Sequence, residues 1–250
     1  MRITRLTAAV TAAMAAAAFA ACGSPTSPSS TSSTSTTTAS AGTDATALYA
    51  KFQSAVTVTM DGTTVTLRSN DTPDHPSPYW GAGNANYEAP QAGMQVNPNL
   101  IVAQTLTLKV PRSPASATAS DTPLGPIGMA VNGVAIFNQY AAGRQPLGQE
   151  ILSFDRYNGH PQNTGQYHYH MEPLWLTTNN GSSSFIGVLL DGFPVYGPKE
   201  STGSAPTGLD SCNGHTHATA EVPAGIYHYH VTSASPYISG CYRGTPGSIG

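Results

Sequence analysis

The sequence predicts an all-β protein, a sandwich or a barrel-like domain with an internal duplication of about 60 residues. Three observations support this class. The 12 Tyr residues and the runs of Thr and Val favour strands, whereas 25 Gly, 20 Pro and only 9% charged residues exclude a helical bundle or a coiled coil. Short alternating segments flank Asn-Gly or Asp-Gly turns. Three motifs recur in the same order along the chain.

The first segment of the chain has the features of an export signal. Arg2 and Arg5 precede an Ala-rich stretch that is too short and too weakly apolar to favour a membrane span. We interpret residues 1–21 as a lipoprotein signal peptide and Cys22 as the lipidation site, because Phe19–Gly23 resembles a lipobox. An ordinary signal peptide with a cysteine nearby is the alternative.

Residues 22–45 are expected to tether the folded part, residues 46–250, to this lipid. From Ser24 to Thr43, 15 of 20 residues are Ser or Thr, which leaves little apolar surface to bury and predicts disorder. The protein is therefore expected to be exported and anchored to the bacterial cell envelope, on its periplasmic or extracellular face. The formal net charge of -3, without a basic stripe, excludes a nucleic-acid partner.

The folded part begins with predicted strands. Phe52–Met60 and Thr63–Leu67 alternate polar and apolar residues on either side of Asp61-Gly62, which predicts a hairpin. Gln104–Val110 is a further alternating strand, and the Pro- and Ser-rich stretch Arg112–Pro126 indicates a loop. No long segment has a convincing helical period.

The rest of the chain is an imperfect duplication. Gly128–Phe137 aligns with Gly187–Tyr196, and both predict a hairpin with an Asn-Gly or Asp-Gly turn. The other two repeated motifs pair Asp155–His160 with Asp210–His215, and Gly165–His170 with Gly225–His230. The offsets are 59, 55 and 60 residues. We infer two half-repeats, about 127–172 and 186–232, related by a pseudo-two-fold axis.

Six of the eight histidines belong to the duplicated motifs: His160, His168, His170, His215, His228 and His230. On a strand, residues two apart point to the same face, so each Tyr-His-Tyr-His motif presents two imidazoles on one face and two tyrosines on the other. Two adjacent imidazoles can converge on one cation, and the Asn-Gly-His histidine can add a third ligand. Asp155 and Asp210 are candidate ligands, or acceptors that fix an imidazole tautomer.

These ligand types favour copper or zinc. Neutral imidazole suits both metals, and an exported site without thiolates fits copper(II) or zinc, whereas calcium prefers oxygen ligands. The pattern leaves open whether the two His pairs share one site or each half closes on its own Asn-Gly-His. A plain strand, with tyrosines in the core and solvated histidines, is the alternative to a metal site.

Cys212 and Cys241 are the two cysteines that remain beside Cys22. An even pair in an oxidising compartment predicts a disulfide. Thiolate metal ligands are the alternative, but no Cys-x-x-Cys spacing supports them.

Together these segments resemble the YHYH-domain family of exported bacterial proteins, some of which are lipoproteins. The resemblance covers Ser69–His75, Gly125–Val134, Asp155–His160, Tyr167–His170, Leu190–Pro198, Asp210–His215 and Tyr227–His230. It implies an exported all-β domain and no settled activity. Through the resemblance, His75 is a further candidate ligand. A loop residue between Pro73 and Pro76 is the alternative.

Three functions follow as hypotheses. The first is a membrane-tethered buffer, carrier or sensor for copper or zinc. The second is a metal-dependent hydrolase or oxidase, whose candidate general bases are Glu172, Asp155, Asp210 and Asp191. The third is a metal-free module that binds glycans or a partner protein through exposed aromatic residues, namely Tyr79, Trp80 and Trp175. We favour the first hypothesis, with the enzyme as the alternative.

Overall fold

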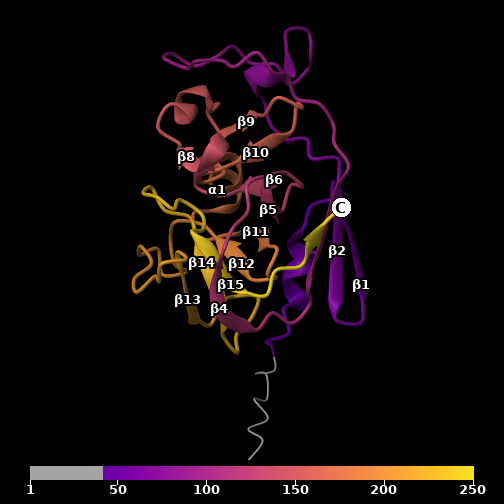
Figure 1. The fold of residues 1–250 in the computed structure, drawn as a ribbon, viewed down its shortest axis with the longest axis vertical. Helices are drawn as coiled ribbons and strands as arrows, with labels where there is room; N and C mark the ends of the chain where they lie inside the picture. Colours follow the sequence, from indigo (N-terminus) through magenta and orange to yellow (C-terminus); the bar gives the residue numbers. More distant parts are fainter. Residues whose placement is uncertain (1–41) are drawn as a thin grey trace, which may run out of the picture. The chain divides into compact units, whose positions relative to one another are not determined.

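The computed structural model describes residues 42–250 (Figure 1). The expected signal peptide, Cys22 and most of the expected tether lie outside the described residues. The fold is all-β, as predicted, and its strands form open sheets that do not close into a barrel. Within this part of the chain, none of the helices has the length and hydropathy needed to cross a membrane.

A four-stranded antiparallel sheet contains the predicted hairpin. Its strands are, in spatial order, β1 (Thr57–Asp61), β2 (Thr64–Ser69), β3 (Leu106–Pro111) and β16 (Ser248–Ile249). Gly62 turns between β1 and β2 with a φ of 55°, a conformation that costs glycine little. The segment Phe52–Val56 was expected to extend β1, but it lies outside the strand, after a 3-10 helix, η1 (Thr46–Lys51).

The duplicated part forms an eight-stranded sheet. The first half supplies β5 (Pro126–Ala130), β6 (Ala135–Phe137), β9 (Gly159–Pro161) and β10 (Tyr167–Tyr169). The second half supplies β11 (Phe185–Leu189), β12 (Pro194–Tyr196), β13 (Gly214–His217) and β14 (Ile226–His230). The spatial order is β13-β14-β12-β11-β5-β6-β10-β9, which Figure 1 shows from the lower to the upper part of the molecule.

This order has the predicted pseudo-two-fold symmetry, with the axis between β5 and β11. Each half runs outward in the same sequence: a hairpin, then the Tyr-His-Tyr-His strand in parallel, then the Asn-Gly-His strand antiparallel. Met129 on β5 pairs with Val188 on β11, its own counterpart at an offset of 59. A Cβ on Gly128 would collide with the carbonyl oxygen of Val188, and one on Gly187 with that of Met129. Glycine therefore allows the two halves to pair closely.

Smaller elements complete the fold. The stretch expected to be a loop, Arg112–Pro126, instead contains β4 (Ser116–Asp121), which pairs with β15 (Cys241–Gly244). The prediction was wrong because the pairing partner lies near the other end of the chain, where no local pattern reveals it. The remaining elements are η2 (Pro78–Trp80), β7 (Tyr140–Ala141), η3 (Ala142–Arg144), β8 (Gln145–Pro146), η4 (Glu150–Ser153) and α1 (Leu174–Asn180).

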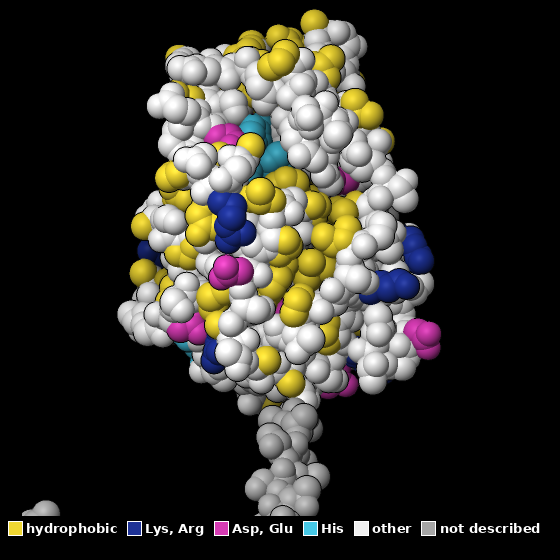
Figure 2. Space-filling view, viewed as in Figure 1, with side chains coloured by type: hydrophobic (Ala, Val, Ile, Leu, Met, Phe, Trp, Pro, Cys, Tyr) yellow, Lys and Arg dark blue, Asp and Glu magenta, His cyan; other side chains and the backbone are white. Residues whose placement is uncertain are grey.

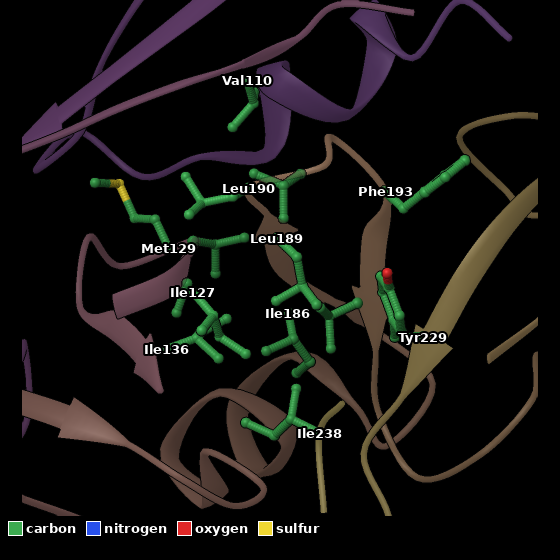
Figure 3. Close-up of a cluster of buried hydrophobic side chains, with 14 of the residues drawn as sticks. Val110, Ile127, Met129, Ile136, Ile186, Leu189, Leu190, Phe193, Tyr229 and Ile238 are labelled. Atoms are coloured by element: carbon green, nitrogen blue, oxygen red, sulfur yellow. The ribbon is translucent and has the colours of Figure 1, made fainter. Parts of the chain in front are cut away.

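The core lies against the centre of the eight-stranded sheet, where residues of both halves meet (Figure 3). Ile127 and Ile136 come from the first half, and Ile186 and Leu189 from the second; all four are fully buried. Val110 of β3 joins the same cluster. The predicted disulfide between Cys212 and Cys241 is present, with Cα atoms 4.7 Å apart, and it connects the loop before β13 to β15.

Candidate metal sites

The duplicated histidines form two separate clusters, one at each end of the eight-stranded sheet. The first cluster comprises Glu150, His160, His168 and His170; the second comprises Glu200, His215, His217, His228 and His230. Within each cluster, one ligand atom per residue lies within 4.8 Å of all the others. Four strands separate β10 from β14, so the clusters are roughly 24 Å apart along the sheet. Each half therefore closes on its own Asn-Gly-His.

Strand register brings the histidines of each half together. His168 on β10 pairs directly with His160 on β9, and His228 on β14 pairs with His215 on β13. Figure 2 shows histidine side chains at the surface in two small groups, one near β9 and one near β13, each beside an acidic side chain. The backbone pairing thus brings the repeated motifs together within each half, which answers the question that the sequence left open.

In the first cluster, His168 and His170 point the same ring nitrogen at each other. His168 donates its Nδ1 hydrogen to the carbonyl of Gln166 (3.1 Å), and His170 donates its own to the carbonyl of Asn138 (2.6 Å). A carbonyl cannot donate, so both Nε2 atoms carry lone pairs when the rings are neutral. These Nε2 atoms lie 3.0 Å apart.

His160 and Glu150 complete the first cluster. The hydroxyl of Ser153 donates to the carbonyl of Glu150 (2.7 Å), so it accepts the Nδ1 hydrogen of His160 (2.8 Å). The Nε2 atom of His160 is then a further lone pair, 3.2 Å from Oε1 of Glu150, and it is buried without a hydrogen-bond partner. The same carboxylate oxygen lies 3.7 Å from Nε2 of His170.

All four imidazoles of the second cluster have the same orientation. Each Nδ1 donates to a backbone carbonyl: His215 to Thr207 (2.9 Å), His217 to Ala218 (2.7 Å), His228 to Ile226 (2.9 Å) and His230 to Gly197 (2.8 Å). Oε1 of Glu200 lies 3.3 Å from Nε2 of His215 and 3.4 Å from Nε2 of His230. The other oxygen lies 3.2 Å from Nε2 of His217. The Nε2 atoms again converge on a carboxylate.

Burial favours the neutral form of the imidazoles on the two Tyr-His-Tyr-His strands. It lowers the pKa of His168 well below its usual value, with neighbouring His170 and His160 acting in the same direction. Burial lowers the pKa of His170 to about 4 and that of His228 to about 3. Burial opposes ionisation of Glu150, whereas the neighbouring imidazoles of His160 and His170 favour it, and the pKa of this carboxyl lies below its usual value. Each neutral imidazole can donate a lone pair to a metal.

Asp155 and Asp210 lie outside both clusters, contrary to their candidacy as ligands. Each carboxylate accepts hydrogen bonds within its own Asn-Gly turn and from the first tyrosine of the following motif: Tyr167 donates to Asp155 (2.7 Å) and Tyr227 to Asp210 (3.0 Å). Tyrosines and histidines point to opposite faces of a strand, so a carboxylate bound to the tyrosine lies on the opposite side of the sheet from the imidazoles. Both residues fix the turn that carries the first histidine.

His75 also lies on the tyrosine side. Its Nε2 is 3.0 Å from the hydroxyl of Tyr169, and its Nδ1 is 3.0 Å from the carbonyl of Pro76. Because the carbonyl can only accept, Nδ1 carries the hydrogen and Nε2 accepts from the hydroxyl of Tyr169. Asn132 donates to the same hydroxyl (3.2 Å). In the second half, Asp191 replaces Asn132 and accepts directly from the equivalent tyrosine (2.6 Å). His75 is therefore a buried hydrogen-bonding residue, and it belongs to neither cluster.

The two clusters differ in how they are covered. Phe137 stacks on His168 at 3.8 Å between ring centroids, and Phe154 packs against the other two imidazoles of the first cluster. In the second half the equivalent positions hold Tyr196 and Leu209. A cavity of about 480 Å³ opens there, and its lining includes four residues of the second cluster: Glu200, His217, His228 and His230.

The sequence patterns missed three members of the clusters. His217 follows His215 by two residues on the same strand, so the alternation of faces could have revealed it. Glu150 begins η4 and Glu200 lies in a loop after β12; these segments do not align between the halves, and no sequence signal marks either residue. The aromatic residues proposed for glycan binding do not form an exposed platform: Tyr79 is fully buried and Trp80 and Trp175 are partly buried.

Comparisons with known proteins identify one family. A family model described as YHYH protein matches residues 107–208 and 199–244. The matched residues contain both clusters and the disulfide. No curated protein and no solved structure matches the chain.

Proposed function

This chain belongs to the YHYH protein family, and we propose that it is an exported protein that binds copper or zinc at its two histidine clusters. The orientation of the seven imidazoles carries the proposal. Every Nδ1 hydrogen is donated to a carbonyl or to Ser153, so every Nε2 lone pair is left facing the others and a carboxylate. Histidines that ligate metals are held in this way.

A bound cation relieves a conflict in the first cluster. The Nε2 atoms of His168 and His170 are 3.0 Å apart, and a hydrogen bond between them requires one ring to be charged. Burial lowers the pKa of both rings and so disfavours that charge. A metal ion between the lone pairs replaces the missing proton. Three imidazoles and one carboxylate match the four-ligand shell of zinc and are also acceptable to copper.

We further propose that the protein acts at the cell envelope, attached through a lipid on Cys22. The support is the signal-like residues 1–21, the lipobox-like residues before Cys22 and the Ser- and Thr-rich segment after it. The disulfide between Cys212 and Cys241 fits the same location, because disulfides persist in oxidising compartments. A tethered protein with two metal sites is suited to buffering, carrying or sensing the metal.

The proposal is tested by measuring metal content. The full chain, purified in detergent without a His tag, is analysed by elemental mass spectrometry after reconstitution with copper or zinc. We expect two metal ions per chain. Replacing His160, His168 and His170 by Ala should remove one ion, and replacing His215, His228 and His230 by Ala should remove the other.

The control for these variants is His75→Gln, which alters a buried histidine outside the clusters. It should retain both ions, and circular dichroism should show that every variant is folded. Absence of copper and zinc from the reconstituted parent protein would contradict the proposal and favour a metal-free binding module. Equal metal loss in His75→Gln would also contradict it.

The cavity beside the second cluster favours a second candidate function, a metal-dependent hydrolase or oxidase. None of the candidate bases Glu172, Asp155, Asp210 and Asp191 is among its lining residues, whereas Glu200 and Glu221 are. A carboxylate beside a metal can take a proton from a bound water. Hydrolysis of activated esters by the zinc-loaded protein, lost in Glu221→Gln with metal retained, would favour this candidate.

A further inference from the structure

We propose that the cavity beside the second cluster binds a small organic carboxylate, and that the carboxylate group ligates the metal ion held there. This inference rests on the proposed function, because it requires a metal at the second cluster. The inference names the class of ligand that the second cluster binds. It also distinguishes the two halves, because the first cluster is closed whereas the second is open to a molecule from solution.

The first cluster is closed and the second is open because the two halves have different aromatic residues beside their histidines. Phe137 lies flat on His168 and covers the first cluster, with Phe154 beside it. At the position equivalent to Phe137, Tyr196 instead lies edge-on to His228, at 5.2 Å between ring centroids. Its hydroxyl donates to the carboxylate of Glu221 (2.7 Å) and lies 2.9 Å from the hydroxyl of Thr219, so it points away from the cluster. The space of about 480 Å³ that remains is the size of a site for a small organic molecule.

The charges that line the cavity favour an anion once the metal is bound. The lining contains two lysines and two glutamates, namely Lys51, Lys199, Glu200 and Glu221. These charges cancel, so a divalent ion gives the cavity a net positive charge. Lys51 is paired with Glu221 (3.4 Å), and Glu200 contacts the imidazoles. Among the described residues, Lys199 has no ion-pair partner, which leaves its ammonium group available to an incoming carboxylate.

The uncharged residues that line the cavity indicate what the rest of the ligand, beyond its carboxylate, should be like. Val131, Phe185 and Tyr196 provide an apolar wall that can pack against a hydrocarbon chain or ring. The hydroxyl of Ser184 lines the same space and is buried without a hydrogen-bond partner, so it can bond a second polar group of the ligand. A carboxylate with an apolar body fits this combination better than an inorganic anion does.

The second cluster also has a ligand that can be exchanged. The side chain of His217 is 42% exposed, whereas those of His215 and His230 are 15% and 2% exposed. In the first half, Gln162 occupies the position equivalent to His217. His228, His230, His215 and Glu200 suffice for four coordination positions, so a carboxylate can join them or displace the exposed imidazole.

The experiment uses cobalt(II), whose visible absorption reports changes in its ligands. The full chain is loaded with cobalt and titrated with benzoate, and separately with acetate as a carboxylate without an apolar body. We expect a saturable change in the cobalt spectrum with benzoate, and weaker binding of acetate. Lys199→Ala should weaken benzoate binding about tenfold, whereas Lys109→Ala, which removes a lysine outside the cavity, should not.

The outcomes separate this inference from the proposed function. If cobalt binds at two sites but benzoate leaves its spectrum unchanged, the ligand inference fails and the metal function stands. Equal benzoate affinity in Lys199→Ala and Lys109→Ala, or equal affinity for acetate and benzoate, also overturns it. If neither cobalt nor zinc binds, both proposals fail. A control variant with Ala at His160, His168 and His170 should keep the benzoate response, because the first cluster is closed.

Discussion

His168 and His170 face each other through their Nε2 atoms, 3.0 Å apart, while each ring donates its Nδ1 hydrogen to a backbone carbonyl. The second half repeats the Nδ1 hydrogen bonds in His228 and His230, which donate to carbonyls at the equivalent positions. The backbone of the sheet therefore fixes the tautomer of each imidazole. Such preorganisation suits a metal ion better than a proton, because each cluster presents several Nε2 lone pairs and a metal ion can accept all of them at once.

The first prediction concerns metal removal. Stripping both metal ions with a chelator should lower the melting temperature by about 10–20 °C, because a ligand at 100 times its Kd stabilises the fold by about 2.7 kcal/mol per site and the chain has two proposed sites. Differential scanning calorimetry of the metal-loaded and stripped protein measures the change. The double variant His168→Ala/His228→Ala serves as the control, and a chelator effect of equal size in it would contradict the prediction.

The second prediction concerns acid stability of the metal-free protein. The folded-state pKa values of His170 and His228 are about 4 and about 3, below the unfolded value of 6.5. Between these values the unfolded chain binds more protons, so stability should fall as the pH decreases from about 6.5 toward 4. The buried His170 should lower the free energy of unfolding by at most about 3 kcal/mol at pH 4 relative to its value above pH 6.5.

Urea unfolding of the metal-free protein at several pH values measures this dependence. His170→Gln should make the decline between pH 6.5 and 4 shallower, because it removes one group that must bind a proton on unfolding. An unchanged slope in this variant would show that the burial of His170 does not control acid stability.

Local patterns predicted the elements whose signals are short-range. The three hairpins, the opposite faces of tyrosine and histidine and the disulfide all follow from turn chemistry, alternation or cysteine parity. The clusters depend on contacts that a local pattern does not contain. Glu150 contacts His160 from the start of η4, whereas Glu200 contacts the second cluster from a loop that has no counterpart in the first half. Asp155 lies on the tyrosine side, where it accepts a hydrogen bond from Tyr167. Tertiary contacts decide which acidic residue meets the imidazoles.

The third prediction concerns the centre of the sheet. Gly128→Ala and Gly187→Ala should each lower the free energy of unfolding by at least about 2 kcal/mol, because the added Cβ collides with a backbone carbonyl of the other half. Chemical denaturation measures both variants. Gly148→Ala is the control, since a Cβ there meets no atom within 4 Å. Wild-type stability in the first two variants would mean that the halves do not pair as β5 and β11 do here.

The fourth prediction concerns Asp71, which is fully buried beside β6. Its carboxylate accepts hydrogen bonds from the amide of Ala135 (2.7 Å) and from the side chain of Gln166 (2.6 Å). Burial nevertheless raises its pKa to about 7. Between pH 4 and 7 the folded state therefore holds a proton that the unfolded chain has lost, so this group's contribution to stability decreases as the pH rises.

Asp71→Asn should remove this contribution. Asn keeps an acceptor for Ala135 and tolerates the φ of 56° at this position, so the backbone can remain in place. Relative to the parent protein, the variant should gain stability between pH 4 and 8, by at most about 4 kcal/mol for a shift of about three pKa units. Urea unfolding across this range measures the difference. A constant difference between the two proteins at all pH values would show that Asp71 ionises as freely in the fold as in water. The histidines and Asp71 act in opposite directions over the same pH range, so only the single variants separate their contributions.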